Sequence, residues 1–344
     1  MSGREPDDRG GEAAIVRTLL RHGLLSAADV VDHRLVTRDL SSSNGLTMIE
    51  RDGEGLLVVK HSRHTAQDWQ GSMVQELAAY QLARIIPGAP FPRMLHSDPT
   101  MMVLEAVAPG TPLSGLAEFS AIAQGAAALG RALGGWHRAT AAADVAVGVA
   151  SQLGQRLPWP LLMGGVDRPA LVDELEPRTR SLVWSHPQLL DQLERAGNLW
   201  QSSACVHGDV RLANALLDSG GDVVLVDWEC AAWGDPGWDL AGAVADYTAA
   251  AMAVWPDADM ATLLHLGGGP VQALEDAYLG SGGSASALDA ARMLLPGRLV
   301  HVAFQYAVWG GADGKADAAR LVALAVEAVQ STAVQSRVAI GVAP

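Results

Sequence analysis

The chain has 344 residues, 49% of them hydrophobic, and a formal net charge of −14. The hydrophobic content excludes an intrinsically disordered protein, and the length is sufficient for two lobes with a well-buried core. The negative charge argues against nonspecific nucleic-acid binding, because the phosphates of DNA or RNA would be repelled.

Neither a membrane span nor a secretion signal is expected. Charged residues such as Arg131, Asp144 and Asp246 interrupt the long Ala-rich stretches. Asp7 and Asp8 stand where a signal peptide would need apolar residues. These features predict a soluble, cytoplasmic protein that does not interact with membranes.

The first hundred residues predict a small β-rich lobe. A polar segment at 1–11 is expected to be a disordered tail, and the amphipathic helix after it carries Ile15 and Leu19. A second helix is expected from about residue 72 to 83. Turn-rich segments separate apolar runs that predict strands at about 33–40, 46–51, 56–60, 93–97 and 101–105.

Helical periodicity dominates the chain after the break at Pro109-Gly110. It predicts helices at about 119–139, 239–254, 258–266, 271–280 and 317–335. Strands followed by helices are typical of an α+β protein. We therefore expect an N-terminal lobe at 12–108 and a C-terminal lobe at 109–344.

One β-like segment interrupts the helical half and carries polar residues at its ends. Two apolar runs, 215–217 and 223–226, flank a Ser-Gly-Gly-Asp turn and predict a hairpin. Asp209 and Asn214 precede this hairpin and Asp227 follows it, so its open end should bring the three side chains together. Carboxylate and amide oxygens are ligands that suit Mg²⁺.

The two cysteines and two further aspartates near the hairpin are predicted to have structural roles. Two cysteines are too few for a disulfide framework or a Cys-rich metal site. Cys205 and Cys230 lie in or beside apolar segments and are predicted to be buried free thiols. Asp235 and Asp239 are predicted to brace a loop or to cap a helix.

The segment His207-Gly208-Asp209-Val210-Arg211-Leu212-Ala213-Asn214, followed by Asp227, resembles the catalytic segment of the aminoglycoside phosphotransferase and choline kinase family. This resemblance implies a bilobal protein-kinase-like fold with the active site in the cleft between the lobes. It implies that Asp209 is the catalytic base and that Asn214 and Asp227 bind Mg²⁺. His207 is expected to orient the loop. Arg211 replaces a second histidine that many relatives carry, and two interpretations stay open: a phosphate or substrate contact, or a solvated surface residue.

The resemblance extends to a nucleotide site for ATP or GTP. Lys60, one of two lysines in the chain, ends an apolar strand where the family places the lysine that binds the α- and β-phosphates. Glu76 stands where its ion-pair partner is expected. The segment from Glu105 to Pro109, which includes Val107, resembles the hinge that receives the adenine. A Ser/Asn-rich loop containing Ser42, Ser43 and Asn44 replaces the Gly-rich loop over the phosphates.

The acceptor is open, because residues 241–344 match no motif. The favoured hypothesis is a kinase acting on a hydroxyl-bearing small molecule, such as a sugar, a choline-like alcohol or an aminoglycoside. The alternatives are a Ser/Thr peptide kinase of a lanthipeptide or thioamide-peptide pathway, working with a partner lyase, and a catalytically silent binding module. The complete set of Lys60, Asp209, Asn214 and Asp227 argues against the silent module.

Overall fold

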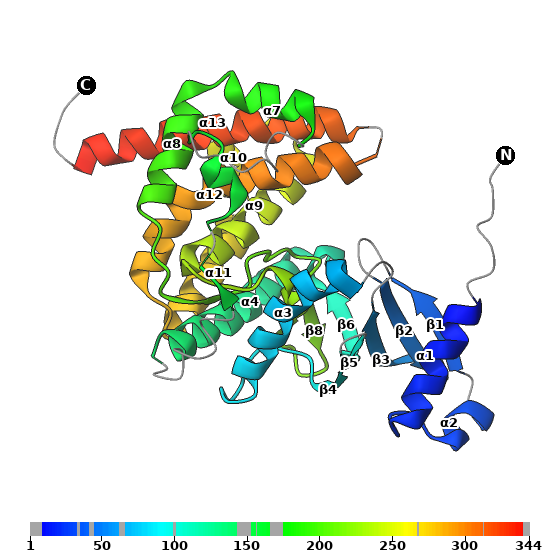
Figure 1. Ribbon diagram of the computed structural model, residues 1–344. Helices are drawn as coiled ribbons and strands as arrows, with labels where there is room; N and C mark the ends of the chain where they lie inside the picture. The colour runs from blue at the N-terminus through cyan, green and yellow to red at the C-terminus, as the bar shows by residue number, and fades with distance from the viewer. Residues whose placement is uncertain are drawn as a thin grey trace. The chain divides into compact units, whose positions relative to one another are not determined.

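The computed structural model describes residues 9–32, 35–40, 45–61, 66–98, 101–142, 153–155, 157–165, 175–266, 268–311 and 313–339 (Figure 1). The chain forms two compact units. Unit 1 comprises Met1–Met73 and Pro92–Thr111, and unit 2 comprises Val74–Phe91 and Pro112–Pro344. Unit 1 holds the larger sheet and unit 2 holds most of the helices, which confirms the α+β class with a β-rich N-terminal part.

Unit 1 is built on a five-stranded antiparallel sheet with the order β1-β2-β3-β5-β4. The predicted meander and the two later strands are confirmed, and β4 lies at one edge. The strands are β1 (Leu35–Asp39), β2 (Gly45–Arg51), β3 (Glu54–His61), β4 (Met94–Ser97) and β5 (Met101–Glu105).

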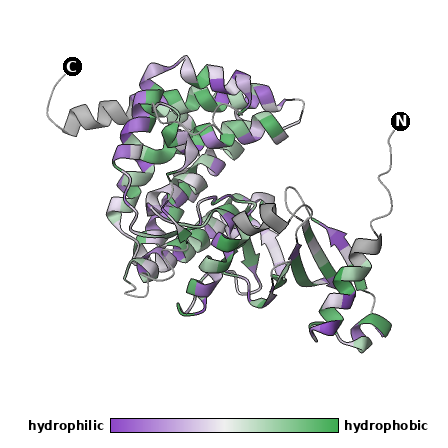
Figure 2. Ribbon diagram, viewed as in Figure 1, coloured by the Kyte–Doolittle hydropathy of each residue, from purple (hydrophilic) through white to green (hydrophobic). Residues whose placement is uncertain are grey.

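Helix α1 (Arg9–Arg21) provides apolar side chains for the core of unit 1. Ile15 and Leu19 of α1 join a buried cluster with Leu57 and Val59 of β3. These two strand residues share one face because side chains alternate along a strand. Figure 2, in the same view as Figure 1, shows β3 coloured largely as hydrophobic. The short α2 (Ala27–Val31) follows α1.

The described part of unit 2 contains the predicted helices and three that the sequence pattern did not reveal. Helix α3 (Ala66–Ala83) begins before the predicted residue 72 and crosses the boundary between the units. The predicted helices are α4 (Phe119–Ala141), α9 (Pro236–Val254), α10 (Met260–Leu266), α11 (Gly268–Gly280) and α13 (Gly314–Ala339). The additional ones are α7 (Pro177–Trp184), α8 (Pro187–Asn198) and α12 (Ala285–Trp309). Short 3₁₀ turns lie at Leu113–Gly115, Trp159–Leu162 and Trp228–Cys230.

Glycines allow α4 and α11 to pack closely. A Cβ atom on Gly130 would lie 2.2 Å from the Leu274 carbonyl oxygen, and one on Gly134 would lie 2.4 Å from the Tyr278 oxygen. Only glycine permits two helix backbones to approach so closely. This contact fixes α4 within unit 2.

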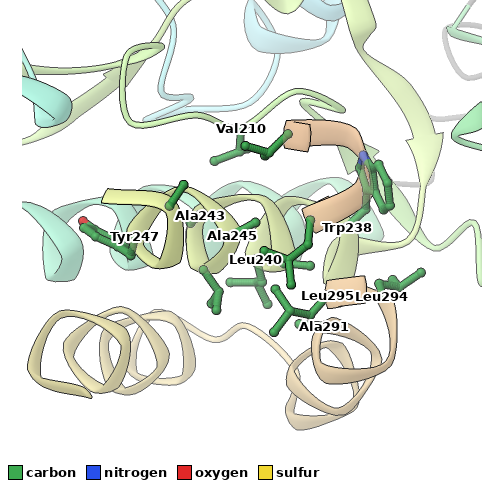
Figure 3. Packing of buried hydrophobic residues seen from close by; sticks show 14 of the residues in the cluster. Val210, Trp238, Leu240, Ala243, Ala245, Tyr247, Ala291, Leu294 and Leu295 are labelled. Atoms are coloured by element: carbon green, nitrogen blue, oxygen red, sulfur yellow. The ribbon is translucent and has the colours of Figure 1, made fainter. Parts of the chain in front are cut away.

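Helices α9 and α12 pack against each other in the core of unit 2. Figure 3 shows Leu240 of α9 beside Ala291 and Leu295 of α12, with Val210 of the predicted catalytic segment nearby. Because α9 is apolar on nearly its whole circumference, it is buried on several sides. No helix of the described residues is both long and apolar enough to cross a bilayer.

Unit 2 also contains two small strand pairs. Strand β7 (Ala204–Val206) pairs antiparallel with β10 (Ala232–Gly234), and β8 (Ala215–Asp218) forms the predicted hairpin with β9 (Val223–Leu225). The predicted break at Pro109-Gly110 forms instead a short strand, β6 (Pro109–Pro112). Residues 207–214, called the catalytic segment for their predicted role, thus lie between two short strands of unit 2.

Candidate active site

The open end of the β8–β9 hairpin joins the residues that the sequence predicted to meet. The Val226 amide donates to the Asn214 carbonyl oxygen at 2.9 Å, so Asn214 lies opposite the residue that precedes Asp227. The Asn214 side-chain nitrogen donates to the Asp209 carbonyl oxygen at 3.2 Å. The structure therefore brings Asp209, Asn214 and Asp227 together, while their chemical roles stay predictions.

Asp227 has an uncommon backbone conformation. Its φ of 68° and ψ of 59° are left-handed, a region that aspartate tolerates better than most residues. The next residue, Trp228, is buried, donates its indole N–H to the Leu225 oxygen at 2.8 Å and stacks on Phe91 with centroids 3.8 Å apart. Packing on the following residue thus holds the conformation of Asp227. Such conformations are found at functional sites.

Two carboxylates act on the buried phenol of Tyr80 in α3. Burial raises the pKa of Tyr80 well above its usual value, and the negative charges of Glu76 and Asp227 raise it further. Glu76 is itself buried, with 3% of its surface exposed. Glu76 and Asp227 therefore both place negative charge near Tyr80.

Asp239 holds the backbone at the start of the catalytic segment. Its carboxylate accepts hydrogen bonds from the amides of His207 at 2.8 Å and Gly208 at 2.9 Å, and it contacts His137 Nε2 at 3.1 Å. Burial alone would raise the pKa of Asp239. The hydrogen bond and charge of His137, together with the hydrogen bond from the His207 amide, outweigh burial and lower the pKa. The predicted bracing role of Asp239 is confirmed.

Asp235 has the other predicted structural role. It is the N-cap of α9, and its carboxylate accepts a hydrogen bond from the Gly237 amide at 2.9 Å. The same side chain accepts from the Gln201 amide at 3.1 Å. Asp235 therefore fixes the start of the helix that carries Asp239.

His207 is fully buried, and both of its ring nitrogens have partners. Nε2 lies 2.8 Å from the Val226 carbonyl oxygen, to which it must donate. Nδ1 accepts a hydrogen bond from the Asp209 amide at 3.3 Å. This arrangement suits the predicted orienting role and leaves no ring nitrogen for proton transfer to a substrate.

Gly208 is required by the conformation of the segment. Its φ of 82° is left-handed, and a Cβ atom there would lie 2.2 Å from the Cys230 carbonyl oxygen. The Gly208 oxygen accepts from the Trp238 indole N–H at 2.8 Å. Cys230 is exposed, so the prediction that it is buried was wrong, whereas Cys205 is buried as predicted.

Arg298 of α12 is a candidate functional residue that the sequence reasoning missed. Only 1% of its surface is exposed, and it donates to the oxygens of Val210 at 2.9 Å and Gly208 at 3.3 Å. The same guanidinium lies 3.6 Å from Asp209 Oδ1 and over the Trp238 ring. An arginine inside the apolar run from Leu294 to Phe304 was the available signal, since buried arginines are rare without partners.

Asp209 therefore has one carboxylate oxygen next to a fixed positive charge. Asp209 Oδ1 is buried and has no hydrogen-bond partner among the residues that the structure describes. The side chain as a whole keeps 18% exposure. The carboxylate is thus anchored on the Arg298 side and remains reachable elsewhere.

Arg211 is half-buried. Its positive charge interacts electrostatically with Asp246 of α9. The Asp246 carboxylate accepts a hydrogen bond from the Leu212 amide at 2.8 Å. Burial raises the pKa of Asp246, an effect that the Leu212 amide and the charges of Arg211 and Arg298 oppose. Asp246, which the sequence indicated only as a charge within an Ala-rich stretch, therefore anchors the loop after Arg211. The charge of Arg211 is partly balanced within unit 2.

The predicted nucleotide residues of unit 1 lie on and after two central strands. Lys60 of β3 is buried, at 6% exposure, and pairs in register with Met102 of β5. By strand alternation it lies on the face opposite Leu57 and Val59, away from the α1 core. Because lysine is seldom fully buried, its burial distinguishes Lys60 from most lysines in proteins.

Two backbone amides of the predicted hinge segment are already hydrogen-bonded within unit 1. The Glu105 amide donates to the Arg93 oxygen at 2.9 Å, and the Ala106 amide donates to the Leu56 oxygen at 3.1 Å. The exposed Glu105 side chain pairs with Arg93 at 2.9 Å. Val107 is half-buried. Because the Glu105 amide is already used, a backbone hydrogen bond from Glu105 to an adenine would have to come from its carbonyl oxygen. The three loop residues Ser42, Ser43 and Asn44 lie outside the described residues.

Comparison with known proteins identifies the family. The model of a phosphotransferase enzyme family matches residues 41–280, which is more than half of the chain. The chain belongs to this phosphotransferase enzyme family. It is therefore a kinase with a hydroxyl group as acceptor. No curated protein sequence matches it significantly.

Solved structures share the kinase-like fold. Macrolide 2′-phosphotransferase MphH from Brachybacterium faecium is 21% identical with a TM-score of 0.53, covering 90% of this chain and 97% of that one. An ethanolamine kinase from Plasmodium vivax is 12% identical with a TM-score of 0.61, covering 94% and 90%. A thermostable mutant of aminoglycoside phosphotransferase APH(4)-Ia, in a ternary complex with ADP and hygromycin B, is 17% identical with a TM-score of 0.55, covering 90% and 97%.

Proposed function

We propose that this phosphotransferase uses ATP and Mg²⁺ to phosphorylate a hydroxyl group of a small molecule. The observation that carries this proposal is the meeting of Asp209, Asn214 and Asp227 at the end of the hairpin. A carboxylate base beside an oxygen-donor metal site is what transfer of a γ-phosphate to a hydroxyl requires.

The residues present fit Mg²⁺. The Asn214 nitrogen donates to the Asp209 carbonyl, which fixes the amide and leaves its oxygen as a metal ligand. Asp227 adds the charged oxygen donor. When bound, Mg²⁺ would neutralise charge on the β- and γ-phosphates. Glu76, whose charge acts on the same tyrosine as that of Asp227, adds negative charge near Tyr80.

Asp209 is proposed as the base that orients the acceptor hydroxyl and takes its proton. The Asp239 and Arg298 contacts hold the backbone on both sides of Asp209, so its carboxylate needs little reorganisation during the reaction. Arg298 also places a positive charge 3.6 Å from one carboxylate oxygen of Asp209. His207 orients the loop and transfers no proton in this scheme.

The remaining roles follow the family resemblance and are proposals. Lys60 would bind the α- and β-phosphates with Glu76 as its partner, and Val107 with the Glu105 carbonyl would receive the adenine. Ser42, Ser43 and Asn44 would cap phosphate oxygens. Arg211, half-buried at the end of the catalytic segment, would contact a phosphate or the acceptor.

A small-molecule acceptor is favoured over a peptide. The structures named above include enzymes whose names give macrolides and ethanolamine as acceptors, and one is bound to hygromycin B. A negatively charged chain would tolerate a cationic acceptor among these compounds.

Transfer from γ-labelled ATP with Mg²⁺ to a panel of acceptors tests the proposal. The panel contains macrolides, aminoglycosides, choline, ethanolamine and Ser/Thr peptides, and the Asp209→Asn variant is the inactive control. We expect labelled product with a small molecule, lost in the variant and on removal of Mg²⁺. Labelling of peptides alone, or equal labelling by wild type and variant, would contradict the proposal.

A further inference from the structure

A second group of potential metal ligands, made of residues that have no role in the site described above, lies in unit 1. It consists of His22, His96 and Asp98, whose ligand atoms all lie within 4.8 Å of one another. Among the described residues, no other set of three His, Cys, Asp or Glu side chains meets this criterion. The two imidazole centroids are 4.1 Å apart, and His96 Nε2 lies 3.3 Å from Asp98 Oδ2.

The end of α1 fixes the position of His22. The Gly23 amide donates to the Leu20 oxygen at 3.1 Å and the Leu24 amide to the Leu19 oxygen at 2.9 Å, with Gly23 at a φ of 68°. This is a Schellman motif, with His22 as the C-cap residue. The C-terminus of a helix carries partial negative charge, which favours a bound cation.

An irregularity in the edge strand fixes His96. The register between β4 and β5 shifts between Met94, which pairs with Leu104, and His96, which pairs with Val103. Such bulges redirect a side chain and often occur next to functional sites. His96 is half-buried, whereas His22 is exposed.

Backbone hydrogen bonds orient Asp98. Its amide donates to the Met101 oxygen at 2.9 Å, and its Oδ1 accepts from the Met101 amide at 3.0 Å. One carboxylate oxygen is thus held by the chain while the other, Oδ2, faces His96. Carboxylates that ligate metals are commonly oriented by such a second hydrogen bond.

We propose that His22, His96 and Asp98 bind a divalent transition-metal ion of the Zn²⁺ class and thereby link the end of α1 to β4. Two imidazoles and a carboxylate suit Zn²⁺, with water as the fourth ligand, whereas Mg²⁺ prefers oxygen ligands only. Ligands at about 2.0–2.2 Å from a tetrahedral ion lie roughly 3.3–3.5 Å apart. The observed 3.3 Å between His96 Nε2 and Asp98 Oδ2 meets this requirement. The exposed His22 gives the ion access.

Calorimetric titration of the full chain with Zn²⁺, in excess Mg²⁺ to occupy oxygen-donor sites, tests the assignment. We expect one Zn²⁺ per chain. Each of three substitutions should weaken Zn²⁺ binding by more than about tenfold: His22→Ala, His96→Ala and Asp98→Asn. Loss of a residue that only hydrogen-bonds to a metal ligand already has an effect of this size. His186→Ala, which removes an imidazole from unit 2, should leave the Zn²⁺ affinity unchanged. Asp227→Asn should also leave the Zn²⁺ affinity unchanged.

Thermal unfolding gives a second readout that controls for folding. Zn²⁺ should raise the melting temperature of wild type and of His186→Ala but not of His22→Ala. Because His22 is exposed, its variant should melt like wild type without Zn²⁺. Failure of wild type to bind Zn²⁺ in excess Mg²⁺, or unchanged affinity in all three ligand variants, would reduce the cluster to a hydrogen-bonded His–Asp pair. Neither result bears on the phosphotransferase site.

Discussion

Strand β3 and the catalytic segment 207–214 position their key residues by different means. Lys60 is placed by the ladder bonds of β3 with β2 and β5. Asp209 is placed by buried side chains from distant helices, chiefly Asp239 of α9 and Arg298 of α12. Backbone ladders survive changes of side chain, whereas the bracing of the catalytic segment does not. Substitution of Lys60 should therefore affect ligand binding alone, and substitutions of the residues that brace Asp209 should affect both activity and stability.

The largest expected effect is on turnover in Asp209→Asn. Removing the carboxylate while keeping the side-chain shape should lower kcat by about 10²–10⁴. The measurement is steady-state phosphorylation of the acceptor found with the panel. The exposed Asp222→Asn is the matched control and should keep wild-type turnover. Unchanged kcat in Asp209→Asn would remove the base role.

Asp239→Asn should destabilise the fold by about 3–5 kcal/mol, because it removes a buried carboxylate charge that contacts His137 and breaks one of the two amide contacts. The folded-state pKa of Asp239 is lowered, so its stabilisation is present above the unfolded pKa of about 3.9 and is lost as the pH falls through the folded value. The stability difference between wild type and variant should be largest near pH 7 and shrink below about pH 4. Denaturant unfolding across this range measures it. The raised pKa values of Asp235 and Asp246 make stability change with pH in the opposite direction. Both residues are present in wild type and in Asp239→Asn, so their effect cancels in the difference.

Arg298→Lys tests whether the buried guanidinium positions Asp209. Lysine keeps the charge but cannot reach both loop oxygens as a fork, so we expect kcat to fall by about 10², with the KM for ATP unchanged. Arg292→Lys on the same helix is half-exposed and serves as the control. A purely structural role for Arg298 would lower the melting temperature without this selective loss of kcat.

Lys60→Arg should have the smallest effect and should act on ligand binding alone. A broader planar guanidinium fits less well between phosphates than a compact ammonium. We expect ATP affinity to fall by about tenfold, or about 1.4 kcal/mol, with little change in the melting temperature without nucleotide. Thermal shifts over an ATP titration give both values. A large loss of stability without ATP would contradict the contrast between β3 and the catalytic segment.

The difference between local and long-range contacts also explains which features the sequence could predict. The hairpin, its turn and the meeting of Asp209, Asn214 and Asp227 depend on residues close in sequence, and alternation and turn chemistry were sufficient for them. Arg298 contacts an oxygen of Val210, 88 residues earlier in the chain, and no local pattern encodes this contact. Helix α12 was also missed because Pro296 and Gly297 interrupt its interior and suggest a break, yet the packing of unit 2 keeps it helical.

The most direct test of the central claim is Mg²⁺-dependent nucleotide binding by wild type and Asp227→Asn. Asparagine tolerates the left-handed backbone at this position, so the variant should fold while losing the charged metal ligand. Melting temperatures are measured with ATP plus Mg²⁺ and with ATP plus a chelator. We predict that Mg²⁺ increases the ATP-induced stabilisation of wild type and adds little to that of Asp227→Asn. An equal Mg²⁺-dependent gain in both proteins would contradict the assignment of Asp227 as a metal ligand.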